Sequence, residues 1–334
     1  MRKPSRWFGR GAAPPQAVPE PPNPATWQRT ADLVALQRHA AGLGVRQAGP
    51  ARARLAGAQA SRLRGRGVDY QESRPYQAGD DVRGMDWRLT ARTTAPHTKL
   101  YQEERERPVI LFVQLHAGMF FGTRGMLKSA LAARAAALLA WAAIGRGDRV
   151  GAVIAGAAHH ELPPRGGKPG VLRLIRLLVE LAEPRRGFAS IDAPGSLNAA
   201  LRRLCRVSLP GSQVLLIGDF DGIDDESGPL LHRLRRHCDV LALQVADPLE
   251  LAPPPPARYG VAAGREPGLL DLRANAARQA YQDYFDAHHR TVSSLLRRHA
   301  IGLARLRTDE DVVAALRGVL AAGAALPDAT RRAA

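Results

Sequence analysis

Val109-Ile-Leu-Phe-Val113 is the stretch of sequence that decides the fold. It is an unbroken apolar run, which is typical of a central parallel strand, because helices cover both faces of a parallel sheet. Similar short runs recur at residues 149–155, 213–217 and 240–245. Segments with helical periodicity separate them. Strands that alternate with helices predict an α/β fold with a doubly wound, mainly parallel sheet.

The segments between these strands are predicted to be helices. Residues 168–182 place apolar side chains on one helical face, and Ser196 is a suitable N-cap for a helix over residues 197–205. Further helices are predicted for residues 30–43, 123–145, 230–237, 272–299 and 309–320. A last strand is predicted at residues 302–306. Ligands of such sheets bind beyond the carboxyl ends of the strands, so the loops at that end are the first candidates for a site.

A second conspicuous stretch precedes the first strand. Residues 76–92 read Y-Q-A-G-D-D-V-R-G-M-D-W-R-L-T-A-R, with three carboxylates and three guanidiniums in a short span. Gly79 predicts a tight turn, since glycine tolerates positive φ, and Trp87 is expected to be an apolar anchor. Two interpretations stay open: an Asp/Arg lattice that pins the loop to its neighbouring domain, or a surface that binds a partner. The residues of this signature loop are Tyr76, Gly79, Asp80, Asp81, Arg83, Asp86, Trp87, Arg88 and Arg92.

The run Y-x-x-G-D-D-x-R-x-x-D-W-x-x-x-A-R resembles the signature of a bacterial family, number fifty-eight in the domain-of-unknown-function series. The resemblance covers residues 50–320. It extends upstream to Gly65-Arg66-Gly67, and downstream through Met119, Phe121-Gly122, Lys128 and Gly147-Asp148-Arg149-Val150-Gly151. It implies a von Willebrand A-like domain preceded by an N-terminal arm that carries the signature loop. Many members are encoded beside MoxR-type AAA+ ATPases, so the resemblance also implies such an ATPase as a partner.

The same resemblance implies a divalent-cation site in the crevice at the carboxyl ends of the strands. The metal motif of von Willebrand A-like domains is D-x-S-x-S after the first strand, a later threonine, and an aspartate after the fourth strand. Here the aligned positions read Gln114, His116 and Gly118, Asp219 matches the later aspartate, and Ser196 is a loose stand-in for the threonine.

Mg²⁺ prefers hard oxygen ligands, usually with at least one or two carboxylates. The substitutions at these positions therefore predict a degenerate crevice that keeps the fold and holds no metal and no cofactor. His116 and Asp219 also leave a transition-metal site open, although the sequence places no third ligand. His288-His289, on the long helix at 272–299, is predicted to lie on a solvated face.

Three large apolar residues, Met119, Phe120 and Phe121, follow the first strand in a row. Exposed apolar clusters mark interaction sites, so these three residues are predicted to form the face that the ATPase contacts. One or two of them could pack inward without removing the face.

The net charge of +17 limits the class of partner. Residues 1–66 hold twelve Lys and Arg and only two acidic residues, which places +10 in the first fifth of the chain. Such a field attracts acidic proteins, anionic lipid headgroups or nucleic acid. No helix-turn-helix, zinc-finger or RNA-recognition motif accompanies it, which disfavours nucleic acid. A basic protein at an anionic membrane surface or associated with nucleic acid remains the alternative function.

The predicted organisation has four parts. A disordered, basic, Pro/Ala-rich tail occupies residues 1–26, and the N-terminal arm with the signature loop occupies 27–107. The von Willebrand A-like domain follows at 108–322, and a C-terminal tail at 323–334. No apolar run is long enough to cross a bilayer, and the N-terminus lacks the apolar core of a signal peptide. Two cysteines outside any C-x-x-C pattern fit a reducing compartment, so a cytoplasmic protein is expected.

None of the motifs for nucleophilic, phosphate-binding or dinucleotide chemistry is present. We therefore expect no enzyme. The expected function is a scaffold or adaptor that works with a MoxR-type AAA+ ATPase in the assembly or maturation of another protein, which the sequence does not name. A hydrolase that uses Asp80, Asp81 and Asp86 is a further alternative; it requires an open pocket and a carboxylate with a raised pKa.

Overall fold

The computed structural model describes residues 26–43, 68–77, 82, 85–93, 95–103, 108–156, 158–184, 196–263 and 266–323. Gly79, Asp80, Asp81 and Arg83 of the predicted signature loop lie outside the described residues, and so do residues 1–25 and 324–334 of the two predicted tails.

Six strands form one sheet in the order β10-β7-β6-β3-β4-β5, with β3 (Pro108–Gln114) inside it. β3 pairs in parallel with β4 on one side and with β6 on the other. The remaining strands are β4 (Arg149–Ala155), β5 (His159–Arg165), β6 (Gln213–Gly218), β7 (Asp239–Ala246) and β10 (Gly302–Arg307). Only β5, at an edge of this sheet, runs antiparallel to its neighbour. The predicted α/β fold with a mainly parallel sheet is confirmed.

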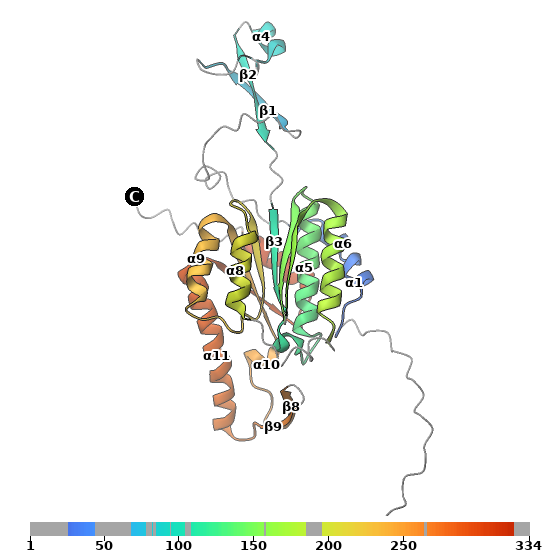
Figure 1. Ribbon diagram of the computed structural model, residues 1–334, viewed down its shortest axis with the longest axis vertical. Coiled ribbons are helices and arrows are strands. Elements are labelled where there is room, and N and C mark those ends of the chain that lie inside the picture. Colours follow the sequence, from blue (N-terminus) through green and yellow to red (C-terminus); the bar gives the residue numbers. More distant parts are fainter. Residues whose placement is uncertain are drawn as a thin grey trace, which may run out of the picture.

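Helices cover both faces of the sheet (Figure 1). Along β3, Val109, Leu111 and Val113 belong to one buried cluster, and Ile110 and Phe112 belong to the other. The first cluster contains residues of α5 (Lys128–Ile144), α6 (Gly167–Leu181) and α12 (Val312–Gly323). The second contains residues of α8 (Leu197–Val207), α9 (Ser227–His237) and α11 (Asn275–Arg298). Successive side chains of a strand point to opposite faces, so the unbroken apolar run supplies both cores.

The N-terminal helices α1 (Thr30–Ala35) and α2 (Gln37–Ala40) also belong to the first core, through Leu33 among others. Two indoles fix them in place: Trp27 Nε1 donates to Val179 O at 2.8 Å, and Trp141 Nε1 donates to Leu33 O at 3.1 Å. The structure differs here from the predicted organisation, which placed these residues in a separate arm. Their apolar side chains cover α5 and α6, so they pack as part of the sheet domain.

The signature loop connects the two strands of a hairpin, and its described part contains a short helix. β1 (Val68–Pro75) pairs antiparallel with β2 (His97–Glu103), and α4 (Trp87–Thr93) lies between them in the chain. Asp86 caps α4, because its Oδ1 accepts a hydrogen bond from the backbone N–H of Leu89 at 3.1 Å. Its Oδ2 accepts from Ser73 Oγ at 2.9 Å. D-W-R-L is therefore the start of a capped helix.

Trp87 was expected to anchor the signature loop, but 67% of it is exposed. It is the first residue of α4 and follows the capping residue directly, so the short helix presents the indole to solvent. Tyr76 is half-buried and closes the turn, with its N–H donating to Pro96 O at 2.8 Å. Arg88 and Arg92 on the same helix are exposed.

Several short elements lie near the carboxyl ends of the strands. η2 (Ala117–Phe120) follows β3, and α10 (Pro248–Leu251) follows β7. Between α10 and α11 the chain forms a hairpin of β8 (Arg258–Ala263) and β9 (Glu266–Asp271). In Figure 1 this hairpin and the N-terminal half of α11 extend past the end of the sheet where α10 lies. Within the described ranges, no helix combines the length and apolar character needed to cross a bilayer.

Candidate functional site

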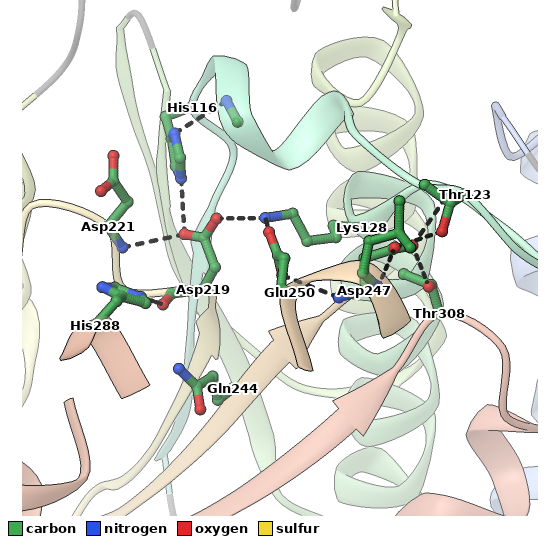
Figure 2. A network of polar contacts seen from close by, with 12 residues as sticks. His116, Thr123, Lys128, Asp219, Asp221, Gln244, Asp247, Glu250, His288 and Thr308 are labelled. Atoms are coloured by element: carbon green, nitrogen blue, oxygen red, sulfur yellow. Dashed lines mark hydrogen bonds and ion pairs between the residues drawn. The ribbon is translucent and has the colours of Figure 1, made fainter. Parts of the chain in front are cut away.

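The candidate site lies where the chain leaves β3, β6 and β7. After β3 the chain runs on to β4, and β6 pairs with the other side of β3. The strand order therefore reverses between β3 and β6, and such a switch point is the usual binding crevice of an open parallel sheet. A connected set of polar side chains occupies this position (Figure 2).

Lys128, the first residue of α5, is at the centre of the set. Its Nζ lies 2.8 Å from Asp219 Oδ2 and 2.6 Å from Glu250 Oε1, and only 3% of its side chain is exposed. Asp219 follows β6 and Glu250 lies on α10 after β7. The ammonium therefore joins one helix to the ends of two neighbouring strands.

The charges of these three residues depend on one another. Burial opposes a charged Lys128, but the two carboxylates outweigh it and raise the pKa of the ammonium above its ordinary value. Burial likewise opposes ionisation of Asp219, but the nearby Lys128 charge and the hydrogen bond from His116 hold its pKa well below the usual range. Lys128 and Asp219 therefore form a buried ion pair with close geometry and a direct hydrogen bond.

His116, in the loop after β3, is the second partner of Asp219. Its Nε2 lies 2.7 Å from Asp219 Oδ1, and its Nδ1 accepts a hydrogen bond from the Gly118 N–H at 3.1 Å. The neutral ring with a proton on Nε2 therefore satisfies both nitrogens. Burial lowers the pKa of His116, but the hydrogen bond to Asp219 and the charges of Asp219 and Asp221 raise it overall.

Gly118 is required by the position of His116. A Cβ atom at residue 118 would lie 2.7 Å from His116 Cε1. A side chain at residue 118 would therefore force the imidazole of His116 or the backbone to shift. In the resembled metal motif this position carries a metal ligand. The glycine found here is explained by the close approach of the His116 ring.

Gln114, at the first position of the resembled metal motif, connects two loops. Its Nε2 donates to Asp221 O at 2.9 Å, and its Oε1 accepts from the Phe220 N–H at 2.9 Å. Phe220 has a φ of +61°, a left-handed conformation that is uncommon outside glycine. The amide of Gln114 therefore stabilises a strained turn, and both its oxygen and its nitrogen have partners.

Asp247 forms a second polar centre, directly after β7, and is fully buried. Its carboxylate accepts hydrogen bonds from the Thr123 N–H and Oγ1, from Thr308 Oγ1 at 2.8 Å and from the Leu249 N–H at 3.0 Å. The Asp247 N–H donates to Glu250 Oε2 at 2.9 Å, which completes a capping box for α10. These bonds tie the loops after β3, β7 and β10 together.

The donor set does not fit the divalent cation that the resemblance implies. The charge between Asp219 and Glu250 is supplied by Lys128, and the amide of Gln114 is committed to backbone groups. Nowhere in the described ranges do three or more His, Cys, Asp or Glu residues gather in a way that could hold a metal ion. A divalent cation at this position would meet the ammonium at close range, and like charges repel strongly in a buried site.

Ser196 has a different role from the one that the metal motif suggested. Its Oγ accepts a hydrogen bond from the Ala199 N–H at 3.4 Å and caps α8, as its position before a helix predicted. It is not among the partners of Asp219. Of the crevice residues predicted from the sequence, His116 and Asp219 are in direct contact. Gln114 and Gly118 support the loops around them, and Ser196 is a helix cap.

The predicted partner face needs a correction. Met119 and Phe120 are buried, with 0% and 5% exposed, and only Phe121 is accessible, with 41% exposed. The 3-10 turn of η2 directs the first two side chains inward, and Met119 joins the first core. The three residues in a row therefore do not form one exposed apolar surface.

The two adjacent histidines of α11 do not lie on a solvated face. His288 Nε2 donates to Asp219 O at 2.9 Å, and His289 Nε2 donates to Glu250 O at 3.3 Å. Both rings are half-buried, and His289 Nδ1 also accepts from Gln244 Nε2 at 3.1 Å. The long helix thus contacts the backbone next to both carboxylates that Lys128 pairs with.

Sequence reasoning missed Lys128, Asp247, Glu250 and His288 as members of the site. The signal for Asp247 and Glu250 was present in D-P-L-E, a capping-box pattern directly after a predicted strand. Lys128 offered no such signal, because a lysine at the start of a helix is usually exposed.

A family model described as protein of unknown function DUF58 matches residues 72–291. Uncharacterized protein Mb1516 of Mycobacterium bovis is 35% identical over 260 residues, which cover 75% of this chain and 78% of that protein.

Two solved structures are similar to the chain at low sequence identity. The conserved hypothetical protein BatB from Bacteroides thetaiotaomicron gives a TM-score of 0.39 at 12% identity, over 66% of this chain and 98% of that chain. A von Willebrand factor type A structure from Catenulispora acidiphila gives a TM-score of 0.37 at 10% identity. The match covers 68% of this chain and 44% of that chain. The order and pairing of the six strands establish the fold of this chain.

Proposed function

The chain belongs to the DUF58 family of proteins of unknown function, and from this premise we propose that it is a non-enzymatic adaptor. In this proposal it works with a MoxR-type AAA+ ATPase in the assembly or maturation of another protein. The ATPase is inferred from the resemblance that the signature loop carries, and the adaptor role from the candidate site.

The observation that supports the adaptor role is the contact of Lys128 with Asp219 and Glu250. A bound metal ion with an open coordination position could take a ligand from a substrate or a partner. A buried ammonium between two carboxylates of the same chain offers no such position. The loops at this end of the sheet are therefore held in one arrangement by internal bonds, which suits a preformed binding surface.

Neither Asp219 nor Lys128 is suited to act as a catalytic acid or base. A catalytic acid or base needs a pKa near the working pH, whereas the pKa of Asp219 is held far below it and that of Lys128 above its ordinary value. Burial raises the pKa of the Cys205 thiol, which disfavours the reactive thiolate. No activated nucleophile follows from these positions.

The surface that we assign to the ATPase is defined by three exposed apolar residues at or beyond the carboxyl end of the sheet. Phe121 follows η2, Leu269 lies on β9, and Tyr284 lies on α11; 41%, 66% and 70% of them are exposed. Tyr284 packs edge-on against Phe285, with ring centroids 5.2 Å apart. Aromatic residues are enriched at protein interfaces, so this set replaces Met119 and Phe120 as the proposed contact.

The test is a titration of a MoxR-type ATPase from the same genome with the full chain. The variants are Phe121→Asp and Tyr284→Asp, each alone and together. Leu209→Asp is the matched control, because Leu209 is 60% exposed and precedes β6, at the opposite end of the sheet. We expect the double variant to weaken binding at least tenfold, or ~1.4 kcal/mol, and the control to bind like the wild type.

Two outcomes would count against the proposal in different ways. Equal binding by the double variant and the wild type would show that the assigned face is wrong. No binding by any form at low salt would remove the ATPase as a partner of this chain. The alternative function predicts instead that anionic vesicles or DNA bind the chain tightly, with an affinity that falls steeply as salt rises.

A further inference from the structure

A cavity of about 420 Å³ lies on the helical face that the N-terminal helices cover. Its walls come from α1, α2, α5 and the start of α12. Three of the five charged residues in its lining are basic: these five are Arg38, Arg134, Arg317, Asp32 and Asp311. None of them belongs to the network around Lys128.

Arg134 is the unusual member of this lining. It lies on α5 between Ala133 and Ala135, which are fully buried, in a helix whose other residues are nearly all buried. Its Nε atom is itself buried and, among the described residues, has no hydrogen-bond acceptor. A buried donor without an acceptor is unfavourable, and native structures usually satisfy such groups with protein, water or a ligand.

The two acidic residues of the cavity already have partners. Asp32 Oδ2 lies 3.0 Å from Arg29 Nε, and the hydrogen bond from Arg29 lowers the pKa of Asp32. Asp311 Oδ1 accepts a hydrogen bond from the Ala314 N–H at 2.7 Å, in the first turn of α12. Neither carboxylate is hydrogen-bonded to Arg134 or Arg317.

The arginines of the cavity have fewer hydrogen-bond partners among the described residues. Arg38 Nε donates to His39 Nε2 at 3.0 Å. Three guanidiniums and two carboxylates line the cavity, and one of these carboxylates is neutralised by Arg29. Arginine therefore outnumbers aspartate in the lining of the cavity, and each guanidinium carries N–H donors in a planar fork.

We propose that this cavity binds a small molecule that carries a phosphate group. Guanidinium groups present a planar fork of N–H donors that matches the oxygens of a phosphate. A volume of about 420 Å³ is within the range of ~300–1,000 Å³ that is usual for small-molecule pockets. The ligand would contact α1 and α2 on one side and α5 and α12 on the other, so its binding would strengthen the attachment of the N-terminal helices.

Isothermal titration of the full chain with pyrophosphate tests the proposal. Sodium chloride at the same ionic strength serves as the reference. The two cavity variants are Arg134→Met and Arg317→Gln; Arg317 is exposed, so its variant should fold normally. The control is Arg236→Gln, an exposed arginine of α9 on the other face of the sheet.

We expect one saturable site for pyrophosphate, about tenfold weaker in each cavity variant and unchanged in the control. Three results would overturn the proposal. The first is the absence of saturable heat beyond the chloride reference. The second is binding that both cavity variants retain in full. The third is equal weakening in Arg236→Gln, which would show that the anion senses only the net charge of the protein.

Discussion

Lys128 Nζ lies 2.8 Å from Asp219 Oδ2 in the buried crevice at the carboxyl ends of β3 and β6. The resemblance to von Willebrand A-like domains aligns this aspartate with a metal ligand, and here the ammonium of Lys128 supplies the positive charge beside it. Glu250, on α10, is the second carboxylate that contacts this ammonium. An internal cation therefore holds this end of the sheet in a fixed arrangement.

Replacing Lys128 by methionine should strongly lower the free energy of unfolding. The variant keeps the length of the side chain but leaves Asp219 and Glu250 buried without a counter-charge. Removing one partner of a buried pair costs on the order of 3–5 kcal/mol. Urea unfolding measures the difference. Arg203→Met is the matched control, since the ion pair of Arg203 with Glu161 is on the surface and is expected to contribute about 0.2–1 kcal/mol. Similar losses in the two variants would contradict a buried Lys128 network.

The raised pKa of His116 predicts how stability changes with pH. A folded-state pKa above the unfolded value of about 6.5 means that the native protein binds more protons near neutral pH. The contribution of His116 to stability is therefore complete below about pH 6.5 and is lost as the pH rises through the folded-state pKa. The difference in unfolding free energy between wild type and His116→Gln should shrink from pH 6 to pH 8.5. A difference that is constant or grows over this range would be inconsistent with the assigned contact to Asp219.

Asp219 has the opposite dependence. Its folded-state pKa lies below the unfolded value of about 3.9, so its contribution is present above that pH and is lost on acidification. Asp219→Asn should therefore be markedly less stable than the wild type at pH 7, and the gap should narrow as the pH falls below about 4. Unfolding curves at pH 7 and pH 3 measure this change. An unchanged gap would mean that the carboxylate is not held in the ionised form.

Asp86 should stabilise the short helix α4 of the signature loop, because it caps the start of that helix. Asp86→Ala removes the acceptor for the Leu89 N–H and should cost about 0.5–2 kcal/mol locally. Asp86→Asn keeps an acceptor oxygen and should restore most of the protection of the Leu89 amide in hydrogen exchange. If the asparagine variant loses as much protection as the alanine variant, the negative charge matters, and the Asp/Arg lattice would be the better interpretation of the loop.

The sheet was predictable because strands buried on both faces have unbroken apolar sequences, and Val109–Val113 supplies side chains to both cores. The site was predictable only in part. His116 and Asp219 are 103 residues apart and were paired by the resemblance. Lys128 contacts carboxylates 91 and 122 residues away. Its role depends on how α5 packs against the ends of β6 and β7, which no local pattern encodes.

Two local predictions failed for related reasons. Met119 and Phe120 were assigned to a surface, but the 3-10 turn of η2 places both in the interior. His288 was assigned to a solvated helix face, but the loop after β6 brings the carbonyl of Asp219 within 2.9 Å of its ring. In each case the tertiary packing, and not the polarity of the neighbouring sequence, decides the environment of the side chain.

The most direct test of Lys128 as the internal cation is thermal unfolding of the wild type, Lys128→Ala and Asp219→Ala, each with and without millimolar Mg²⁺ or Mn²⁺. A ligand that binds only the native state must raise its apparent stability. We predict no metal-dependent shift for the wild type. Lys128→Ala leaves Asp219 and Glu250 without their counter-charge and should unfold at a lower temperature than the wild type, with or without metal. A millimolar-range shift in the wild type that is lost in Asp219→Ala would contradict the claim that Lys128 is the cation of this site.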